Sequence, residues 1–443
     1  MSLLLAPFER LYRGSRIGWT AVCVYLRIKL PRWWDRLLRR DPKLRDMTPV
    51  HQRNAEHIFH TATRLKGLLI KMCQIVGTRS DVFPAAYVKT LSKAQDRVPP
   101  RSFDEMRRVV EEDFEKPLGA IFAEFDETPV AAASLAQVHR ARLLDGREVA
   151  VKVRYPDIEH IVKTDLSASR LICQIYEFFD PQPLELLPLL EEMQKYLRLE
   201  LDFRREVENA ERVRALFAKD DHVIVPAMHK EFSTERVITM EFVGGIKVTE
   251  IEQLKEAGID PREVVNGLMT IYNRMILAYG FFQADPHPGN LFIQPGPRFV
   301  LLDFGLAKEL PKNFGLAIFE LMFSMMTFNE AAMVRAFREL GFRTKTGDES
   351  TYLELAQRMI GASEDGTFRG EFTEEMTDEL FEAIRQNPIV EVPTDFVLVS
   401  RAFSLLSGIA HTLGHRANVL DTMGPGGAPG LATPNRERRT ATT

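Results

Sequence analysis

The spacing of apolar residues predicts helices towards both ends of the chain and strands between them. Apolar positions follow helical spacing through most of residues 1–120 and again through residues 246–415. Residues 121–245 instead contain short runs rich in β-branched side chains, which are typical of strands. Residues 416–443 are rich in Gly, Pro and Thr, and we predict that they form a disordered tail. The pattern therefore predicts an α+β protein whose sheet follows a long helical segment.

The strand-rich region is predicted to contain two strand pairs separated by a long charged helix. The first pair meets across Asp145-Gly146, a dipeptide typical of a tight hairpin. A Pro-Gly-Pro turn at residues 295–297 indicates a further hairpin within the otherwise helical C-terminal region. The predicted elements are strands over 137–144 and 147–153, a helix over about 189–219, strands around 222–225 and 236–242, and strands over 290–293 and 299–302.

Changes in this pattern and in charge divide the chain into five predicted regions. Gly244-Gly245 follows the last strand of the strand-rich region and is typical of a hinge between two lobes. We predict a basic helical head over 1–50, a helical extension over 51–120, an N-terminal lobe over 121–245, a helical C-terminal lobe over 246–415 and the tail over 416–443.

Composition and charge exclude several classes of protein. Hydrophobic residues make up 45% of the chain and charged residues 27%, which excludes a mainly disordered chain and a membrane protein with several spans. The formal net charge of −4 argues against a nucleic-acid partner. Residues 1–40 nevertheless carry nine basic and two acidic residues, so the head is strongly positive while the rest is acidic. A basic head of this kind indicates an anionic surface, such as anionic membrane lipids, as partner.

The head has the composition of a peripheral membrane segment rather than of a membrane span. Its apolar run over 17–26 is shorter than the roughly 20 residues that a spanning helix needs. Adjacent tryptophans, Trp33 and Trp34, lie among arginines, as in an interfacial anchor. A basic helix docked on the acidic body is the alternative explanation. The three cysteines lack metal-ligand spacing and indicate a reducing, cytoplasmic location.

Five side chains occur in the order of a kinase active site. Lys152 lies within a run of β-branched residues, like the strand lysine that contacts the phosphates of ATP. Glu206, on the charged helix, is its candidate partner. Asp285 and Asn290 have the spacing of the catalytic loop, in which the Asp acts on the attacking hydroxyl and the Asn binds metal. Asp303 opens an Asp-Phe-Gly sequence, where a carboxylate can bind Mg²⁺.

Each of these residues also has an ordinary explanation when it is taken alone. The lysine could face solvent on an edge strand, the glutamate could lie on a solvated helix face, and Asp285 to Asn290 could be a Pro-rich turn. His287 in that turn is more simply a structural hydrogen-bonding residue than a metal ligand. The common order of all five, with a hairpin between Asn290 and Asp303, favours the kinase interpretation.

Two features depart from a typical protein kinase. No G-x-G-x-x-G precedes Lys152, so the ATP phosphates would be held differently, through Ser134 and the amides after it. The loop in that place consists of Ala131, Ala132, Ala133 and Ser134. After Asp303 there is no Ala-Pro-Glu, and an apolar helix is predicted over 314–328. A platform for peptide substrates is therefore expected to be missing.

Over roughly residues 50–330 the sequence resembles the UbiB/AarF-like atypical kinases, also called the ADCK family. The resemblance is carried by the alanine-rich loop, the Lys152 strand, the Asp285 to Asn290 loop, and Glu200 and Asp202, which match the family's E-x-D motif. It implies a bilobal protein-kinase-like fold with an N-terminal helical extension, which binds ATP or ADP with Mg²⁺. It also implies a link to ubiquinone or isoprenoid-lipid metabolism at membranes, and weak or absent phosphorylation of proteins.

The helical extension carries the counterpart of the family's K-x-G-Q motif. Lys71-Met72-Cys73-Gln74 has Cys73 where the family has glycine. Helical spacing places Lys71 and Gln74 opposite an apolar stripe, so they could simply face water. The resemblance implies instead that Lys71, Gln74, Glu200 and Asp202 control substrate access to the active site. It also makes Glu206 the partner of the strand lysine.

The sequence thus predicts an atypical kinase-like enzyme, either an ATPase or a small-molecule or lipid kinase, that acts at membranes on an isoprenoid or quinone-like lipid. Biosynthetic protein partners are possible for such an enzyme. The alternative is a catalytically silent pseudokinase that uses nucleotide as a switch to bind lipid or partners. A second stripe, at Phe319, Met322, Phe323 and Met326, is predicted to be core, with a lipid groove as the alternative.

Overall fold

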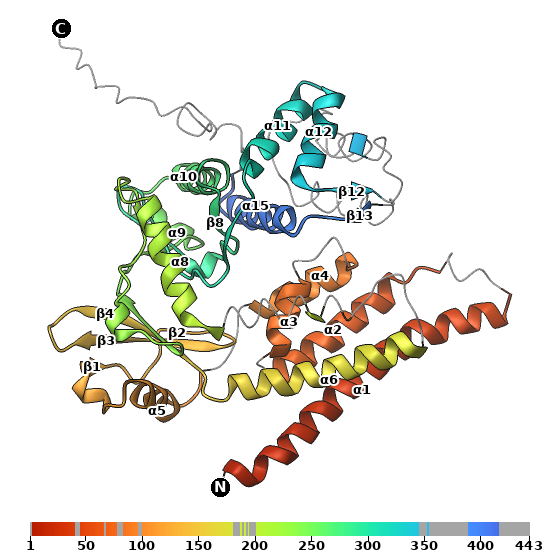
Figure 1. Cartoon of the computed structure of the whole chain (residues 1–443), viewed down its shortest axis with the longest axis horizontal. Coiled ribbons are helices and arrows are strands. Elements are labelled where there is room, and N and C mark those ends of the chain that lie inside the picture. The colour runs from red at the N-terminus through yellow and green to blue at the C-terminus, as the bar shows by residue number, and fades with distance from the viewer. Residues whose placement is uncertain are drawn as a thin grey trace. The chain divides into compact units, whose positions relative to one another are not determined.

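A computed structural model of the chain shows two compact units, and both contain helices and strands (Figure 1). One unit comprises Met1–Glu208 and Ala227–Phe242, and the other comprises Asn209–Pro226 and Val243–Thr443. The structure describes residues 2–39, 45–65, 68–77, 83–95, 100–179, 187, 190, 191, 194, 201–344, 352, 353 and 389–415. The predicted tail over 416–443 lies outside the described residues.

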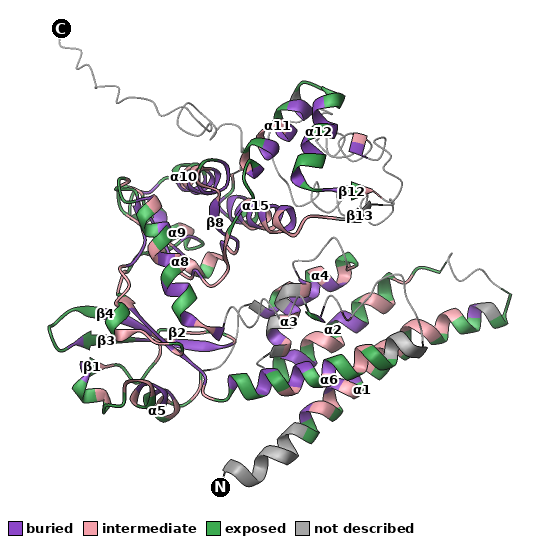
Figure 2. Cartoon of the chain, in the orientation of Figure 1, coloured by how far each residue is buried: buried purple, intermediate pink, exposed green. Residues whose placement is uncertain are grey.

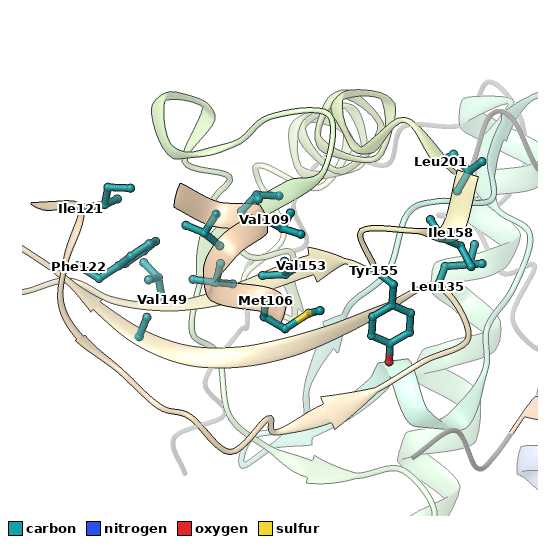
Figure 3. Packing of buried hydrophobic residues seen from close by; sticks show 14 of the residues in the cluster. Met106, Val109, Ile121, Phe122, Leu135, Val149, Val153, Tyr155, Ile158 and Leu201 are labelled. Carbon is teal, nitrogen blue, oxygen red and sulfur yellow. The ribbon is translucent and has the colours of Figure 1, made fainter. Parts of the chain in front are cut away.

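The first unit is built on an antiparallel sheet with the order β1-β3-β4-β6, and the short strand β2 pairs with β3. The strands are β1 (Phe122–Phe125), β2 (Ala131–Ala132), β3 (Ala136–Leu143), β4 (Glu148–Arg154) and β6 (Val237–Glu241). Val149, Val151 and Val153 alternate along β4 and are fully buried on one face. They belong to a core with Met106 and Val109 of helix α5 (Phe103–Phe114), shown in Figure 3. The even positions of β4, including Lys152, are thereby directed to the opposite face.

The rest of the first unit consists mainly of helices. These are α1 (Ser2–Leu37), α2 (Thr48–Leu65), α3 (Leu68–Val76), α4 (Ala85–Leu91) with the 3-10 turn Ser92–Gln95, and α6 (Ile158–Phe179). A small core forms where Ala55 and Ala62 of α2 pack with Cys73 of α3 and Tyr87 and Leu91 of α4. This core fixes the helix that carries the K-x-G-Q counterpart.

The basic helix α1 is docked on the unit along one face. Arg13, on that face, is almost fully buried and forms a two-point ion pair with Asp165 of α6, at 2.6 and 3.0 Å. Its third nitrogen donates to the carbonyl of Leu65 at 2.6 Å. Burial raises the pKa of Asp165 above its ordinary value, although the hydrogen bond from Arg13 acts in the opposite direction. Thr20 and Thr61 join α1 to α2 through a 3.0 Å hydrogen bond.

The second unit holds a sheet with the order β5-β10-β9-β7 and most of the remaining helices. Its strands are β5 (Val223–Ile224), β7 (Ile246–Lys247), β8 (Phe281–Gln283), β9 (Leu291–Gln294), β10 (Arg298–Leu301), β11 (Ala307–Glu309), β12 (Arg343–Thr344) and β13 (Ile389–Glu391). Its helices are α9 (Ile251–Glu256), α10 (Pro261–Asn273) with a π-helical turn at Arg274–Tyr279, α11 (Phe314–Met326), α12 (Glu330–Leu340) and α15 (Thr394–Thr412). Strands β8 and β11 pair with each other, as do β12 and β13.

Two predictions about individual elements are wrong, and one long helix was not predicted. The strand pair expected over 222–225 and 236–242 does not exist, because β5 pairs in parallel with β10 while β6 pairs with β4. The charged helix expected over 189–219 is not continuous, because Asp202 is not helical and α8 (Phe203–Leu216) begins after it; most of residues 189–200 lie outside the described residues. Helix α6, which is amphipathic and long, was not predicted at all.

The physical reason for the first error is that pairing depends on distant residues. Strand β6 pairs with β4, and its residues Val237, Ile238 and Thr239 are almost fully buried. Strand β5 has only two residues, and so short a strand is stable only beside a neighbouring strand. The second stripe is likewise only partly core. Met322 is buried, but Phe323 is 56% exposed. The side chain of Met326 lies outside the described residues.

Among the helices that the structure describes, none has a stretch both long enough and apolar enough to cross a membrane.

Candidate functional site

The candidate strand lysine and helix glutamate form a close ion pair within the first unit. Lys152 Nζ lies 2.7 and 2.9 Å from the two carboxylate oxygens of Glu206. Lys152 leaves the face of β4 that is opposite the valine core, and Glu206 lies in the first turn of α8. Both side chains are largely buried, at 14% and 10% exposed, and the Phe203 ring lies 5.2 Å from Lys152 Nζ.

The alanine-rich loop is a tight turn between β2 and β3. The amide of Ala133 donates to the carbonyl of Ala136 at 2.8 Å and closes the turn around Ser134. Tyr155, just after β4, holds this turn, because its amide donates to Leu135 and its hydroxyl to Ala133. The loop is therefore fixed to the end of the strand that carries Lys152. Whether Ser134 and its neighbours contact phosphate stays a prediction.

The candidate catalytic loop lies in the second unit, between β8 and β9. His287 turns the chain, since its amide donates to the carbonyl of Asp285 at 2.7 Å and its Nδ1 accepts from the amide of Gly289 at 3.1 Å. The interpretation of His287 as a hydrogen-bonding residue of the turn agrees with this geometry. The turn brings Asn290 to the start of β9.

The hairpin of β9 and β10 brings the two candidate metal ligands to the same end. Leu291 pairs with Leu301, so the next residues outward are Asn290 and Leu302, and the amide of Leu302 donates to the carbonyl of Asn290 at 3.0 Å. Asp303 follows directly. Carboxylate and amide oxygens are the donors that Mg²⁺ prefers, so the hairpin register itself assembles a suitable pair of side chains.

The backbone at Asp303 is held in an unusual conformation by buried neighbours. Its φ of +61° is uncommon for a residue other than glycine. Gln283, which is 1% exposed, donates to the carbonyls of Leu302, at 3.0 Å, and of Asp303, while Tyr272 donates to Gln283 at 2.5 Å. Asp303 Oδ1 itself accepts from the amide of Gly305 at 3.1 Å. Residues at metal and phosphate sites commonly carry such locally strained backbone.

Of the four residues predicted to control substrate access, only Asp202 has a side chain that the structure describes. Asp202 precedes α8 and accepts from the amide of Arg204 at 3.1 Å, so it caps the helix and does not share a helix face with Glu206. Glu200 and the side chains of Lys71 and Gln74 lie outside the described residues. Cys73 is buried, which raises the pKa of its thiol to about 12. It occupies the small core rather than a reactive position.

Sequence reasoning missed a direct partner of the candidate catalytic aspartate. Arg401 of α15 lies 3.0 Å from Asp285, with the arginine side chain 11% exposed and the aspartate 29% exposed. No local motif marks Arg401, because it lies 116 residues from Asp285 in sequence. Gln283 and Tyr272 were also missed, because the burial that distinguishes them is not visible in the sequence.

The structure therefore brings together two separate sets of predicted residues. Lys152 and Glu206 form one set within the first unit, and Asn290, Asp303 and Asp285 belong to the second. Among the described residues, no group of three or more His, Cys, Asp or Glu side chains could hold a metal ion. A kinase-type Mg²⁺ needs only one or two protein carboxylates, since phosphate oxygens supply further ligands.

The family model of the ABC1 atypical kinase-like domain matches residues 93–337, which is more than half of the chain. The chain belongs to this family. The predicted membership of the UbiB/AarF-like kinases is thereby confirmed.

Named relatives agree with the ABC1 assignment. AarF domain-containing protein kinase 1 of Xenopus laevis is 32% identical over 380 residues, covering 82% of this chain and 72% of that protein. Protein ACTIVITY OF BC1 COMPLEX KINASE 7, chloroplastic, of Arabidopsis thaliana is 32% identical over 366 residues, covering 81% of this chain and 52% of that protein. An uncharacterized protein of Synechocystis is 32% identical over 368 residues, covering 82% of this chain and 62% of that protein. The chain thus spans half to three quarters of these ABC1 relatives.

A solved structure shares the fold. The Rv3197 protein of Mycobacterium tuberculosis, in complex with erythromycin, superposes with a TM-score of 0.61 at 21% identity, covering 87% of this chain and 98% of that chain. Together with the ABC1 match, this confirms the predicted α+β kinase-like fold with an N-terminal helical region.

Proposed function

We propose that this ABC1 protein binds ATP with Mg²⁺ and acts as an atypical phosphotransferase or ATPase on a small-molecule or lipid substrate at a membrane. The observation that carries this proposal is the Lys152–Glu206 ion pair. A glutamate that approaches a strand lysine with both oxygens, and shields it from water, holds the ammonium ready for phosphate. The family membership and the two candidate metal ligands support the same activity.

Each candidate residue then has one task. Lys152 would contact the α- and β-phosphates, and Glu206 would orient it. Asn290 and Asp303 would hold Mg²⁺, which neutralises charge on the transferred phosphoryl group. Asp285 would orient the attacking hydroxyl or water and accept its proton. The tight alanine turn would cover the phosphates in place of a glycine-rich loop.

The segment after Asp303 supports a substrate other than an extended peptide. Ala307–Glu309 forms β11 and pairs with β8, and α11 begins at Phe314. These residues form a paired strand and the start of a helix in the second unit, and they leave no long loop after Asp303. Leu316 and Phe323 of α11 are exposed, which favours an apolar acceptor such as an isoprenoid or quinone-like lipid. Biosynthetic protein partners remain part of this proposal.

The free face of α1 supports action at a membrane. Trp19 and Val22 are exposed and follow the buried residues Ile17 and Thr20 by two positions, about 200° around the helix. The exposed side therefore lies opposite the docked side (Figure 2). Its apolar residues recur at three- and four-residue spacing. They are Trp19, Val22, Leu26, Leu30, Trp33 and Leu37, each between 43% and 62% exposed. We call these six residues the α1 stripe.

Charge and residue type identify an anionic bilayer as the partner of the α1 stripe. Helical spacing places Arg16 and Arg27 along one edge of the stripe, and Lys29 and Arg32 along the other. Basic side chains on both edges of an apolar, tryptophan-containing face can reach lipid phosphates while the face enters the interface. The docked arginine, Arg13, contributes to folding and not to this surface.

The alternative function, a nucleotide-switched pseudokinase without turnover, is favoured by one observation. The ion pair with Arg401 occupies one carboxylate oxygen of Asp285. If that contact withholds the carboxylate from substrate, the domain could bind nucleotide without catalysing transfer.

Replacing Arg401 separates these two functions. In the proposed enzyme Arg401 orients Asp285, so Arg401→Ala should lower turnover about tenfold, or about 1.4 kcal/mol of barrier, with unchanged Mg·ATP affinity. Arg335→Ala, which removes an exposed ion pair with Glu320, is the matched control and should leave turnover unchanged. Steady-state phosphate release measures both. A rise in turnover in Arg401→Ala would instead support the switch function.

The proposed nucleotide site is tested most directly at Lys152. Lys152→Ala removes a charge-assisted phosphate contact, which typically costs about 1.5–3 kcal/mol, so calorimetric titration should show Mg·ATP affinity falling about 10- to 150-fold. Lys255→Ala removes an exposed lysine of α9 that pairs with Glu252 and serves as control. Unchanged affinity and unchanged turnover in Lys152→Ala would contradict the assignment.

A further inference from the structure

Arg154 is buried next to the candidate lysine and serves no role in the mechanism above. It lies two residues after Lys152 on β4, so the two side chains leave the same face of the sheet. The Arg154 side chain is only 3% exposed. Burial lowers the pKa of its guanidinium from the ordinary value, and its Nε has no hydrogen-bond partner. A buried arginine is costly, so its position calls for a structural or functional reason.

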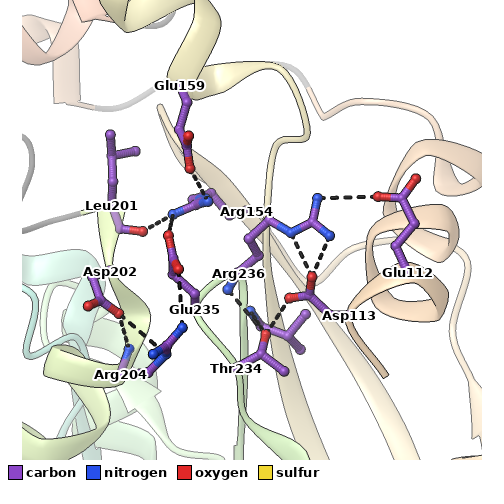
Figure 4. A network of polar contacts seen from close by, with 11 residues as sticks. Glu112, Asp113, Arg154, Glu159, Leu201, Asp202, Arg204, Thr234, Glu235 and Arg236 are labelled. Carbon is purple, nitrogen blue, oxygen red and sulfur yellow. Dashed lines mark hydrogen bonds and ion pairs between the residues drawn. The ribbon is translucent and has the colours of Figure 1, made fainter. Parts of the chain in front are cut away.

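The contacts of Arg154 converge on the start of the helix that carries Glu206. Its Nη1 donates to the carbonyl of Leu201, two residues before α8 begins. Its Nη2 donates to Glu159 of α6 at 2.7 Å, and Nη1 lies 3.8 Å from Glu235. Figure 4 shows the guanidinium between these groups. Arg154 thus joins strand β4 directly to the segment that leads into α8.

Glu235 holds the same helix start from the other side. Its carbonyl accepts from the amide of Phe203 at 3.2 Å, and its carboxylate accepts from Arg204 at 3.1 Å. Asp202 completes the arrangement by capping the amide of Arg204. Arg154 therefore links β4 to the residues just before α8, and Glu235, just before β6, links the first residues of α8 to the segment that leads into β6.

These contacts fix where Glu206 lies. Glu206 is three residues beyond Phe203, or about one helical turn, so the position of the helix start determines its approach to Lys152. Lys152 and Arg154 share one strand, so the anchor and the target of the glutamate move together. We infer that Arg154 is a positioning residue that aligns Glu206 with Lys152. Its effect on nucleotide binding rests on the proposed function, whereas its effect on the helix does not.

The surrounding cavity offers a matched control. A cavity of about 440 Å³ is lined by Arg154, Arg204 and Arg236, whose charges are balanced by Asp113, Glu159 and Glu235. Arg236 donates to Asp113 at 2.7 Å and also contacts Glu112, so its side chain ties β6 to α5. Among the described residues, the Arg236 side chain forms no hydrogen bond or ion pair with α8. A change at Arg236 therefore perturbs the same cavity without loosening the glutamate helix.

The test compares Arg154→Met with Arg236→Met in the full chain. Hydrogen–deuterium exchange of the amides over 203–208 should speed up at least tenfold in Arg154→Met and stay within twofold in Arg236→Met. Mg·ATP affinity should fall at least tenfold in Arg154→Met. In a Glu206→Gln background the same Arg154→Met change should add less than a twofold loss, because the positioned group is already neutralised.

The outcomes separate failure of this inference from failure of the proposed function. If the wild type binds no nucleotide, the function is wrong, yet faster exchange in Arg154→Met would still support the positioning role. If exchange over 203–208 is unchanged, or the affinity losses of Arg154→Met and Glu206→Gln are additive, Arg154 is not a positioning residue. Should Arg154→Met fail to fold, Glu235→Gln gives the same test, because Glu235 is 47% exposed and bonds to Arg204 at the helix start.

Discussion

Asp303→Asn is expected to lower Mg²⁺-dependent turnover by about a thousandfold, which corresponds to about 4 kcal/mol of barrier. The carboxylate is the charged member of the Asn290–Asp303 pair, and an amide binds Mg²⁺ far more weakly. The shape of the side chain hardly changes, and its Oδ1 can still accept from the amide of Gly305. Nucleotide affinity without metal should therefore stay near that of the wild type. Phosphate release over a range of Mg²⁺ concentrations measures the effect.

Asp260→Asn is a closely matched control for this change. Asp260 also accepts, through Oδ1, from the amide two residues later, at 2.8 Å, and it caps α10 in the same unit. The Asp260→Asn substitution also replaces a carboxylate by an amide in the same local geometry, but it does so away from the β9–β10 hairpin. Turnover in Asp260→Asn should match the wild type. If Asp303→Asn also retained turnover within twofold, Asp303 would not be a metal ligand.

The elements that the sequence predicted well are those defined by neighbouring residues. The hairpin across Asp145-Gly146 was placed within one residue at each strand, since alternation and turn residues are local signals. The hairpin of β9 and β10 was predicted for the same reason. That hairpin also determines that Asn290 and Asp303 come together, so part of the candidate site followed from local pattern alone.

The errors arise where contacts join distant parts of the chain. Nothing local to β5 shows that it pairs with β10 rather than β6. Arg401 and Arg154 reach their partners across 116 and 47 residues. An arginine in a helix or on a strand looks like surface charge until its partner is placed beside it. Asp202 fell inside the helix predicted over 189–219, because its capping role depends on where α8 begins.

The structure bears directly on one of the two explanations for the basic head. The sequence allowed either a membrane anchor or a helix docked on the acidic body. The structure shows docking through Arg13 and Thr20, yet it leaves the α1 stripe exposed on the other side. Because docking fixes α1, the α1 stripe is already exposed and ordered before any partner binds. A preorganised apolar face loses less entropy on binding than a disordered anchor would.

The α1 stripe should therefore determine membrane binding. The triple change Trp19→Ser, Leu26→Ser and Trp33→Ser should weaken co-sedimentation with anionic vesicles at least a hundredfold. Each tryptophan can bury about 150–250 Å², and apolar area contributes about 25 cal/mol per Å², so even partial insertion of two indoles accounts for several kcal/mol. Binding by the wild type should also weaken with salt, since nearby Lys and Arg residues contribute about 1 kcal/mol each within a Debye length.

A control must remove exposed apolar side chains elsewhere. Val130, Leu144 and Phe328 are 55%, 63% and 59% exposed and lie outside α1, so their triple change to Ser should leave vesicle binding intact. Sedimentation velocity of both triple variants addresses the competing occupant, a second copy of the chain. If the wild type is dimeric in solution and only the α1 variant becomes monomeric, while vesicle binding is equal in all three proteins, the α1 stripe is a self-association surface. Loss of vesicle binding with unchanged oligomeric state is the result that membrane docking requires, because lipid contact then depends on the apolar face itself.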